Sequence, residues 1–122
     1  MKFTDSHEWT DAENSGLVRI GITHYAQKEL GDIVYVELPA AGKQVNAGQE
    51  IAVLESTKAA ADIYSPVSGE IMEVNQNLSS NPELINRDPE GEGWILKVRP
   101  SNIAELDLLM DLPAYQAMLN GA

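Results

Sequence analysis

Residues 51–69 of the chain read IAVLESTKAAADIYSPVSG, two short strand-like patterns on either side of a lysine. The apolar run 51–54 is typical of a buried strand, and the alternation at 62–64 is typical of a second strand. The residues from Ser65 to Gly69 then supply a turn. The stretch therefore predicts a β-hairpin that carries Lys58 near its tip.

Two interpretations of Lys58 are open on these residues. Charged side chains are common on hairpins, so a solubilising role is the ordinary interpretation. Only 8 of the 122 residues are Lys or Arg, however, and Lys58 stands between Glu55 and Asp62 with three alanines directly after it. An amine on such an uncrowded tip is a nucleophile that another protein can reach and acylate.

The composition indicates a globular protein that binds neither nucleic acid nor membranes. An apolar fraction of 43% in 122 residues is enough for one domain with a core. The formal net charge of −11 repels nucleic acid and anionic membrane surfaces, and it suits docking on basic faces of partners. Solubility alone is the alternative reason for that charge. The sequence shows no membrane-length apolar run and no transit peptide, and we expect a cytoplasmic monomer from a bacterium or archaeon. The absence of cysteine removes disulfides and thiolate metal sites but fixes no compartment.

Further elements are predicted on both sides of the hairpin. Alternating apolar residues predict strands at 18–22, 33–38, 71–74 and 94–98. Thr23 is placed to cap a helical turn over 25–30 that ends at Gly31. The stretch 75–93 is expected to be mostly loop, anchored by Leu84 and Ile85.

A weak internal repeat brackets the hairpin. Residues 31–36 read GDIVYV and residues 69–74 read GEIMEV. If the similarity is not chance, it predicts two halves related by a pseudo-two-fold axis, with Lys58 at one end.

After Pro100 the apolar spacing becomes helical. Four apolar residues are expected to form a face that packs on the sheet: Ile103, Leu106, Leu109 and Met110. Ser101 or Asn102 is predicted to cap this helix, and Glu105 is placed to complete a capping box with Asn102. Pro113 then opens a second short helix over 114–119.

Motifs for catalysis are missing from the sequence. There is no nucleophile elbow, phosphate loop or dinucleotide fingerprint. His7 and His24 are the only histidines, and their spacing with Glu8 does not fit a metal site, so we expect no metal. Trp9 is expected in the core or as a groove wall, and Glu8 is either a carboxylate at the edge of that groove or a solvated acid.

The chain resembles the H protein of the glycine cleavage system over about residues 3–120. The matching motifs are SHEW at 6–9, GIT at 21–23, AQ at 26–27, LGDIVYVELP at 30–39, ESTKA at 55–59, DIYSPVSGE at 62–70, LIN at 84–86 and GW at 93–94. The resemblance implies a mostly β fold, the lipoyl/biotinyl-type barrel-sandwich hybrid with pseudo-two-fold halves, a short N-terminal helical turn and short C-terminal helices. It also implies a single lipoyl-carrier domain over 1–122 with a helical extension at about 101–120.

The resemblance further implies a lipoyl carrier that is not itself an enzyme. Lys58 matches the family lysine that holds lipoate in amide linkage. In the family, the arm takes the aminomethyl group of glycine from the P protein (glycine decarboxylase) to the T protein (aminomethyltransferase), and the L protein (dihydrolipoamide dehydrogenase) reoxidises it. A lipoate-protein ligase or octanoyltransferase attaches the arm, and Glu55 and Asp62 are expected to mark the site for it.

The loaded arm of the family folds back into a surface cleft. In this chain the candidates to form that cleft are Glu8 and Trp9, with the segment 23–30 beside them.

Some residues depart from the family pattern, and other carriers are alternatives. Thr57 stands where the family usually has Val, and Ala61 where it often has Ser; Thr is close to Val in shape, so the turn is expected to persist. A biotin carrier domain would flank the lysine with methionines, and a 2-oxoacid dehydrogenase lipoyl domain would have Asp before it and no C-terminal helices. Within the family, the second interpretation is an H-like protein that relays lipoyl or octanoyl groups to other enzymes.

Overall fold

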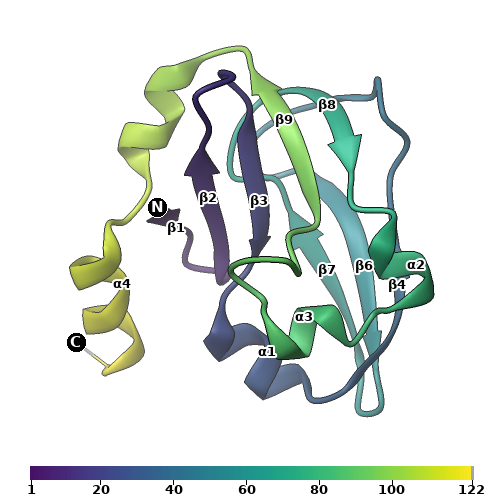
Figure 1. Ribbon diagram of the computed structural model, residues 1–122. Helices are drawn as coiled ribbons and strands as arrows, with labels where there is room; N and C mark the ends of the chain where they lie inside the picture. Colours follow the sequence, from purple (N-terminus) through teal and green to yellow (C-terminus); the bar gives the residue numbers. More distant parts are fainter. Residues whose placement is uncertain (122) are drawn as a thin grey trace.

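Two antiparallel sheets face each other and enclose the main core (Figure 1). The computed structural model describes residues 1–121. The larger sheet contains, in spatial order, β1 (Lys2–Phe3), β2 (Glu8–Ala12), β3 (Val18–Ile22), β9 (Leu96–Pro100), β8 (Gly69–Val74) and β5 (Gln44–Val45). The smaller sheet contains β4 (Ile33–Glu37), β6 (Glu50–Ser56) and β7 (Ala60–Tyr64). The predicted strands are confirmed, except that the last one begins at Leu96 and includes Pro100, and β1, β2 and β5 are not among those predicted; the fold is mostly β.

The core forms because each sheet turns its alternating apolar side chains toward the other sheet. Ile20 and Ile71 from the larger sheet and Leu54 from the smaller sheet are completely buried in one cluster. A second, smaller cluster joins Phe3, Trp9 and Tyr115 at the N-terminal edge of the larger sheet.

The two copies of the internal repeat lie in different sheets. The first copy forms β4 in the three-stranded sheet, and the second forms β8 in the six-stranded sheet. The β6–β7 hairpin lies between the copies in the chain, and its turn extends to one end of the molecule (Figure 1).

The helical turn after β3 has the predicted cap and end, and it begins one residue earlier than predicted. It is α1 (His24–Leu30); the Thr23 side chain accepts a hydrogen bond from the amide of Ala26, and Gly31 follows with φ +83°. The region expected to be mostly loop contains two one-turn helices, α2 (Asn77–Ser80) and α3 (Leu84–Arg87). They escaped prediction because a single turn is too short to show a helical period.

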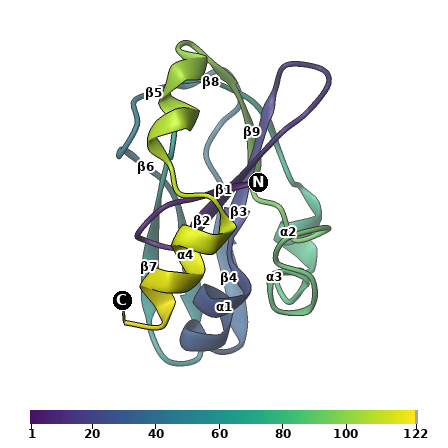
Figure 2. The ribbon, with the colours of Figure 1, turned by 90° about the vertical axis from the view of Figure 1, so that its left-hand side faces the viewer.

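The C-terminal segment differs from expectation in its first part. It consists of the 3₁₀-helix η1 (Ile103–Leu108) and the helix α4 (Leu112–Leu119), which runs along the side of the larger sheet (Figure 2). The expected apolar face is only partly formed, since Ile103 is 61% exposed while Leu106 packs on the core. Asn102 caps η1, but the capping box is wrong: Glu105 instead accepts hydrogen bonds from the amide and hydroxyl of Ser68, at 2.7 and 3.0 Å.

None of the helices among residues 1–121 has both the length and the apolar character needed to cross a membrane.

Candidate functional site

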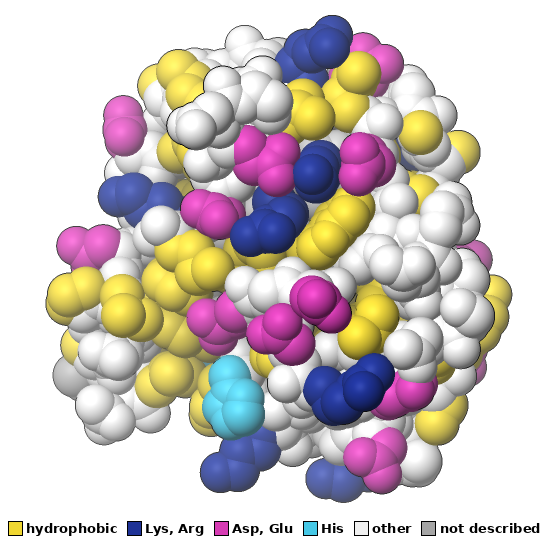
Figure 3. Space-filling view, viewed as in Figure 1, with side chains coloured by type: hydrophobic (Ala, Val, Ile, Leu, Met, Phe, Trp, Pro, Cys, Tyr) yellow, Lys and Arg dark blue, Asp and Glu magenta, His cyan; other side chains and the backbone are white. Residues whose placement is uncertain are grey.

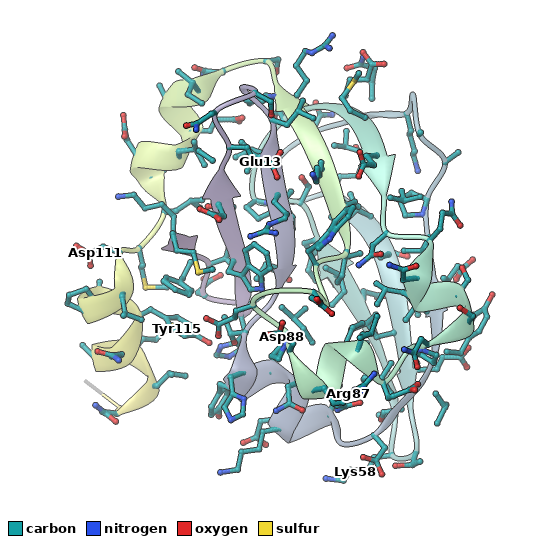
Figure 4. The ribbon with its side chains drawn as sticks, in the orientation of Figure 1. Glu13, Lys58, Arg87, Asp88, Asp111 and Tyr115 are labelled. Atoms are coloured by element: carbon teal, nitrogen blue, oxygen red, sulfur yellow. The ribbon has the colours of Figure 1, made fainter. Side chains whose placement is uncertain are left out.

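Lys58 lies in the turn between β6 and β7, and its side chain is exposed (Figure 4). Ser56 organises this turn. Its hydroxyl accepts from the amides of Lys58 and Ala59, each at 3.1 Å, and donates to the Ala59 carbonyl at 3.1 Å. The short side chain of Ser56 therefore holds the backbone of the turn. None of these hydrogen bonds uses the Lys58 amine, which stays unobstructed.

The base of the turn is fixed to the corner between α1 and β4. The Thr57 amide donates to the carbonyl of Asp32 at 3.1 Å. The stem of Lys58 lies against Gly31, where an added Cβ would stand 3.1 Å from Lys58 Cε. Gly31 has φ +83°, so both its backbone and the lysine stem favour a residue without a side chain.

Asn86 of α3 ties this corner together. Its Nδ2 donates to the Gly31 carbonyl at 2.8 Å and to Gln27 Oε1 at 3.0 Å, and its Oδ1 accepts from the Ile33 amide at 2.9 Å. The role of Asn86 is not visible in the sequence, because its partners lie more than 50 positions away.

Glu55 and Asp62 lie on the two strands that lead into and out of the turn. Glu55 stands opposite Ala60, and Asp62 stands opposite Val53. Both side chains are exposed, and neither forms an ion pair with another residue in the range 1–121. They are therefore free to contact a protein that approaches Lys58.

A groove begins beside the hairpin and follows β7. Its first part is a cavity of about 350 Å³ between α1 and β7, bordered by Leu30 and Ala61 near the hairpin and by Ser6 at its far end. Its second part, of about 430 Å³, is bordered by Ser6, Glu8 and Tyr64. Because Ser6 borders both cavities and successive residues of β7 line them, they lie end to end.

Glu8 is buried at the second part of the groove. Its side chain is 1% exposed, which excludes the solvated alternative. Glu8 Oε1 accepts from the hydroxyls of Thr4 and Ser6, at 2.5 and 2.6 Å, and Oε2 accepts from the Tyr64 amide at 3.4 Å. None of the ion pairs within residues 1–121 involves Glu8. A buried carboxylate without a cation of its own is suited to receive an ammonium group.

The structure places Trp9 in the core, one of the two positions expected for it. Its ring is completely buried, its Nε1 donates to the Pro89 carbonyl at 2.9 Å, and an added Cβ on Gly21 would stand 2.7 Å from the ring. Trp9 borders neither part of the groove that Glu8 and the α1 segment line; it belongs to β2, and its ring packs against Gly21 of β3.

The two histidines belong to separate contacts. His7 Nδ1 lies 2.8 Å from the Tyr115 hydroxyl, and His24 Nδ1 lies 3.2 Å from Gln27 Nε2. Within residues 1–121 no three His, Asp or Glu side chains are grouped as metal ligands would be.

An exposed lysine on a braced hairpin, at the end of a two-sheet sandwich with a groove beside it, defines a carrier domain of the swinging-arm class. Comparisons with known proteins specify which carrier. The family model described as glycine cleavage H-protein matches residues 1–122.

Individual relatives agree with the family model over nearly the whole chain. The glycine cleavage system H protein of Halorhodospira halophila is 49% identical, over 98% of this chain and 92% of the relative. That of Teredinibacter turnerae is 54% identical, over 94% of this chain and 88% of the relative. The crystal structure of a glycine cleavage system H protein from Mycobacterium marinum superposes with a TM-score of 0.87 at 40% identity, covering 99% of this chain and 96% of that one. The chain therefore belongs to the glycine cleavage H-protein family, the lipoyl carriers of the glycine cleavage system.

Proposed function

We propose that Lys58 carries lipoate in amide linkage and that the chain shuttles the aminomethyl group of glycine from the P protein to the T protein, with reoxidation by the L protein. The observation that carries this proposal is the exposed Lys58 amine at the tip of a braced hairpin that opens onto a groove. When attached, lipoate supplies a disulfide that can be reduced, loaded and reoxidised. The chain itself supplies presentation and shelter, and no catalytic group.

Recognition by a lipoate-protein ligase or octanoyltransferase is assigned to the hairpin strands. Glu55 and Asp62 are exposed on the two strands that enter and leave the turn of Lys58, so an enzyme that approaches the lysine can meet all three side chains. The turn between them is rigid because Ser56 satisfies its backbone amides.

Shelter for the cargo is assigned to the groove, with Glu8 at its far part. An aminomethyl group is protonated at neutral pH, and a charge-assisted hydrogen bond to the Glu8 carboxylate would hold that proton on the amine. Trp9 has an indirect part in this arrangement, since it follows Glu8 in β2 and its buried ring anchors that strand.

The decisive experiment is the intact mass of the full chain from cells able to make lipoate. We expect one lipoyl group on the wild type and none on Lys58→Arg, which keeps the charge but loses the acylatable amine. Lys43→Arg is the matched control and should still gain the lipoyl mass. Acylation removes one positive charge, so a native gel should show the net charge move from −11 to −12.

Peptide mapping gives the contrary outcome directly. Lipoate on Lys28 or Lys43 would disprove the assignment of Lys58, and a biotinyl mass would disprove the lipoyl carrier itself. The monomeric state and the cytoplasmic location remain predictions, to be tested by sedimentation and by cell fractionation.

A further inference from the structure

The C-terminal segment reaches back to the segment that carries Glu8. The Phe3 amide donates to the Met110 carbonyl at 2.8 Å, and the Met110 amide donates to the Phe3 carbonyl at 2.9 Å. In α4, which follows Met110, the ring of Tyr115 stacks on the ring of Phe3 with centroids 4.8 Å apart. Residues near both ends of the chain are thus joined beside the groove.

The Tyr115 hydroxyl makes the innermost of these contacts. It projects from α4 toward α1 (Figure 4) and lies 2.8 Å from His7 Nδ1 and 2.7 Å from Thr23 Oγ1. The side chain is 4% exposed, and this burial raises the pKa of Tyr115 above its ordinary value. The hydroxyl therefore remains protonated near neutral pH and can bridge both neighbours.

His7, one of the two residues that the hydroxyl contacts, has an unusual backbone. Its φ of +74° is the only positive value among the non-glycine residues from 1 to 121. His7 lies between Ser6 and Glu8, borders the first part of the groove, and accepts a hydrogen bond from the Thr23 amide at 3.0 Å. A backbone in this region persists only where its surroundings hold it, and such positions often serve a site.

We propose that Tyr115 is a positioning residue for the groove: its hydroxyl holds His7 in the left-handed conformation and so sets Ser6 and Glu8 in place. The proposal explains what the C-terminal helix contributes to the site. That the groove shelters cargo rests on the proposed function, whereas the positioning itself is a property of the chain without any arm.

The purely structural alternative is that α4 only covers Phe3 and Trp9. Tyr115→Phe separates the two, because it keeps the stacked ring and removes only the hydroxyl. If the hydroxyl holds His7 and its neighbours at the groove in place, its removal should speed amide hydrogen exchange at Thr23 and Glu8 in the full, unmodified chain. The Thr23 amide donates to the His7 carbonyl, and the Glu8 amide donates to Thr4 Oγ1. Loss of a hydrogen bond typically corresponds to roughly threefold to tenfold faster opening.

Two further variants make the exchange experiment specific. His7→Asn tolerates a positive φ but is too short to reach the Tyr115 hydroxyl, so it should reproduce the effect. Tyr35→Phe removes a hydroxyl from the opposite sheet and should leave exchange at Thr23 and Glu8 unchanged. Unchanged exchange at both amides in Tyr115→Phe would overturn the proposal.

A second readout uses the lipoylated chain after loading with glycine and P protein and removal of that enzyme. Loss of cargo consumes water: R–S–CH₂–NH₃⁺ + H₂O gives R–SH + CH₂O + NH₄⁺, so free formaldehyde reports it. Formaldehyde release should be faster from Tyr115→Phe than from the wild type, in proportion to the increase in amide exchange at Thr23 and Glu8. If the wild type releases formaldehyde as fast as free loaded dihydrolipoamide, the sheltering function fails, while the exchange result still decides the role of Tyr115.

Discussion

At the scale of single residues, Glu8 carries the clearest chemical signal in the groove. Its carboxylate is buried, receives two hydroxyl hydrogen bonds and forms none of the ion pairs found within residues 1–121. Burial of an anion is costly unless it is paired as well as hydrogen-bonded, which is why we assign Glu8 to an ammonium guest.

We predict that Glu8→Gln shortens retention of the aminomethyl group. The amide keeps the size of the side chain but loses the charge, and a hydrogen bond between charged groups is typically worth about 1.5–3 kcal/mol, or about tenfold and more in rate. Formaldehyde release after removal of the P protein measures the effect, with Glu73→Gln on the exposed face of β8 as the control. Release at the wild-type rate from Glu8→Gln would leave Glu8 a purely structural acid.

Tyr115 gives a pH dependence whose sign follows from its burial. Burial raises the pKa of the folded hydroxyl above the unfolded value of about 10, so the unfolded chain loses its proton first as pH rises. This contribution to stability is fully present below the unfolded pKa and is lost as pH rises through the folded pKa. We expect the free energy of unfolding of the wild type to fall more steeply above about pH 10 than that of Tyr115→Phe; equal slopes in denaturant titrations would contradict this.

At the scale of elements, the lysine hairpin depends on a helix that is distant in sequence. Asn86 of α3 binds the Gly31 carbonyl and the Ile33 amide, and the Asp32 carbonyl between them accepts from Thr57 at the foot of the turn. The hairpin is thereby braced from outside its own two strands.

We predict that Asn86→Ala loosens the hairpin and slows its modification. Its three hydrogen bonds are lost, so amide exchange at Thr57 should rise and lipoylation should show a higher KM for the chain. Asn75→Ala is the matched control. Asn75 Nδ2 also donates to two carbonyls, those of Glu92 and Trp94, but Asn75 does not contact the hairpin corner that Asn86 holds.

The comparison of the two asparagine variants decides the point. Both should lower the melting temperature, because each leaves buried polar groups unpaired. Only Asn86→Ala should change exchange at Thr57 and the KM of lipoylation. Equal effects of both variants on lipoylation would mean that general stability, and not the hairpin brace, is responsible.

At the scale of the whole molecule, the acidic charge is unevenly compensated. On the outer face of the larger sheet, basic and acidic side chains alternate (Figure 3), and Arg19–Asp11 and Lys97–Glu13 form ion pairs at 3.3 and 3.0 Å. The hydrogen bond from Lys97 also holds the pKa of Glu13 below its usual value. Around the lysine hairpin, by contrast, the exposed acids Glu55 and Asp62 have no such partners within residues 1–121.

We predict that docking with the P protein weakens as salt rises. Charges are screened beyond about 8 Å at physiological ionic strength, so the main loss should be in the association rate. Glycine decarboxylation at low and high salt gives the apparent affinity for the chain. Asp62→Asn should weaken docking at low salt more than Glu73→Gln on the opposite sheet, and an affinity independent of salt would contradict electrostatic docking.

Local patterns were enough to predict much of the architecture. The strand periods, the Thr23 cap, the Gly31 stop and the hairpin turn at Lys58 are confirmed, because each depends on residues only a few positions apart. The family motifs predicted a lipoyl carrier of the glycine cleavage system, which the comparisons support independently.

Only the tertiary structure decided how the site is assembled. The amide of Tyr64 meets Glu8 across 56 positions, and the Tyr115 hydroxyl meets His7 across 108 positions. The sequence could not show whether Glu8 is solvated or buried, nor that Glu105 binds Ser68 and leaves the predicted capping box unformed. A side chain's own neighbours determine its local conformation, but its burial and its hydrogen-bond partners depend on which distant elements the packed sheets bring beside it.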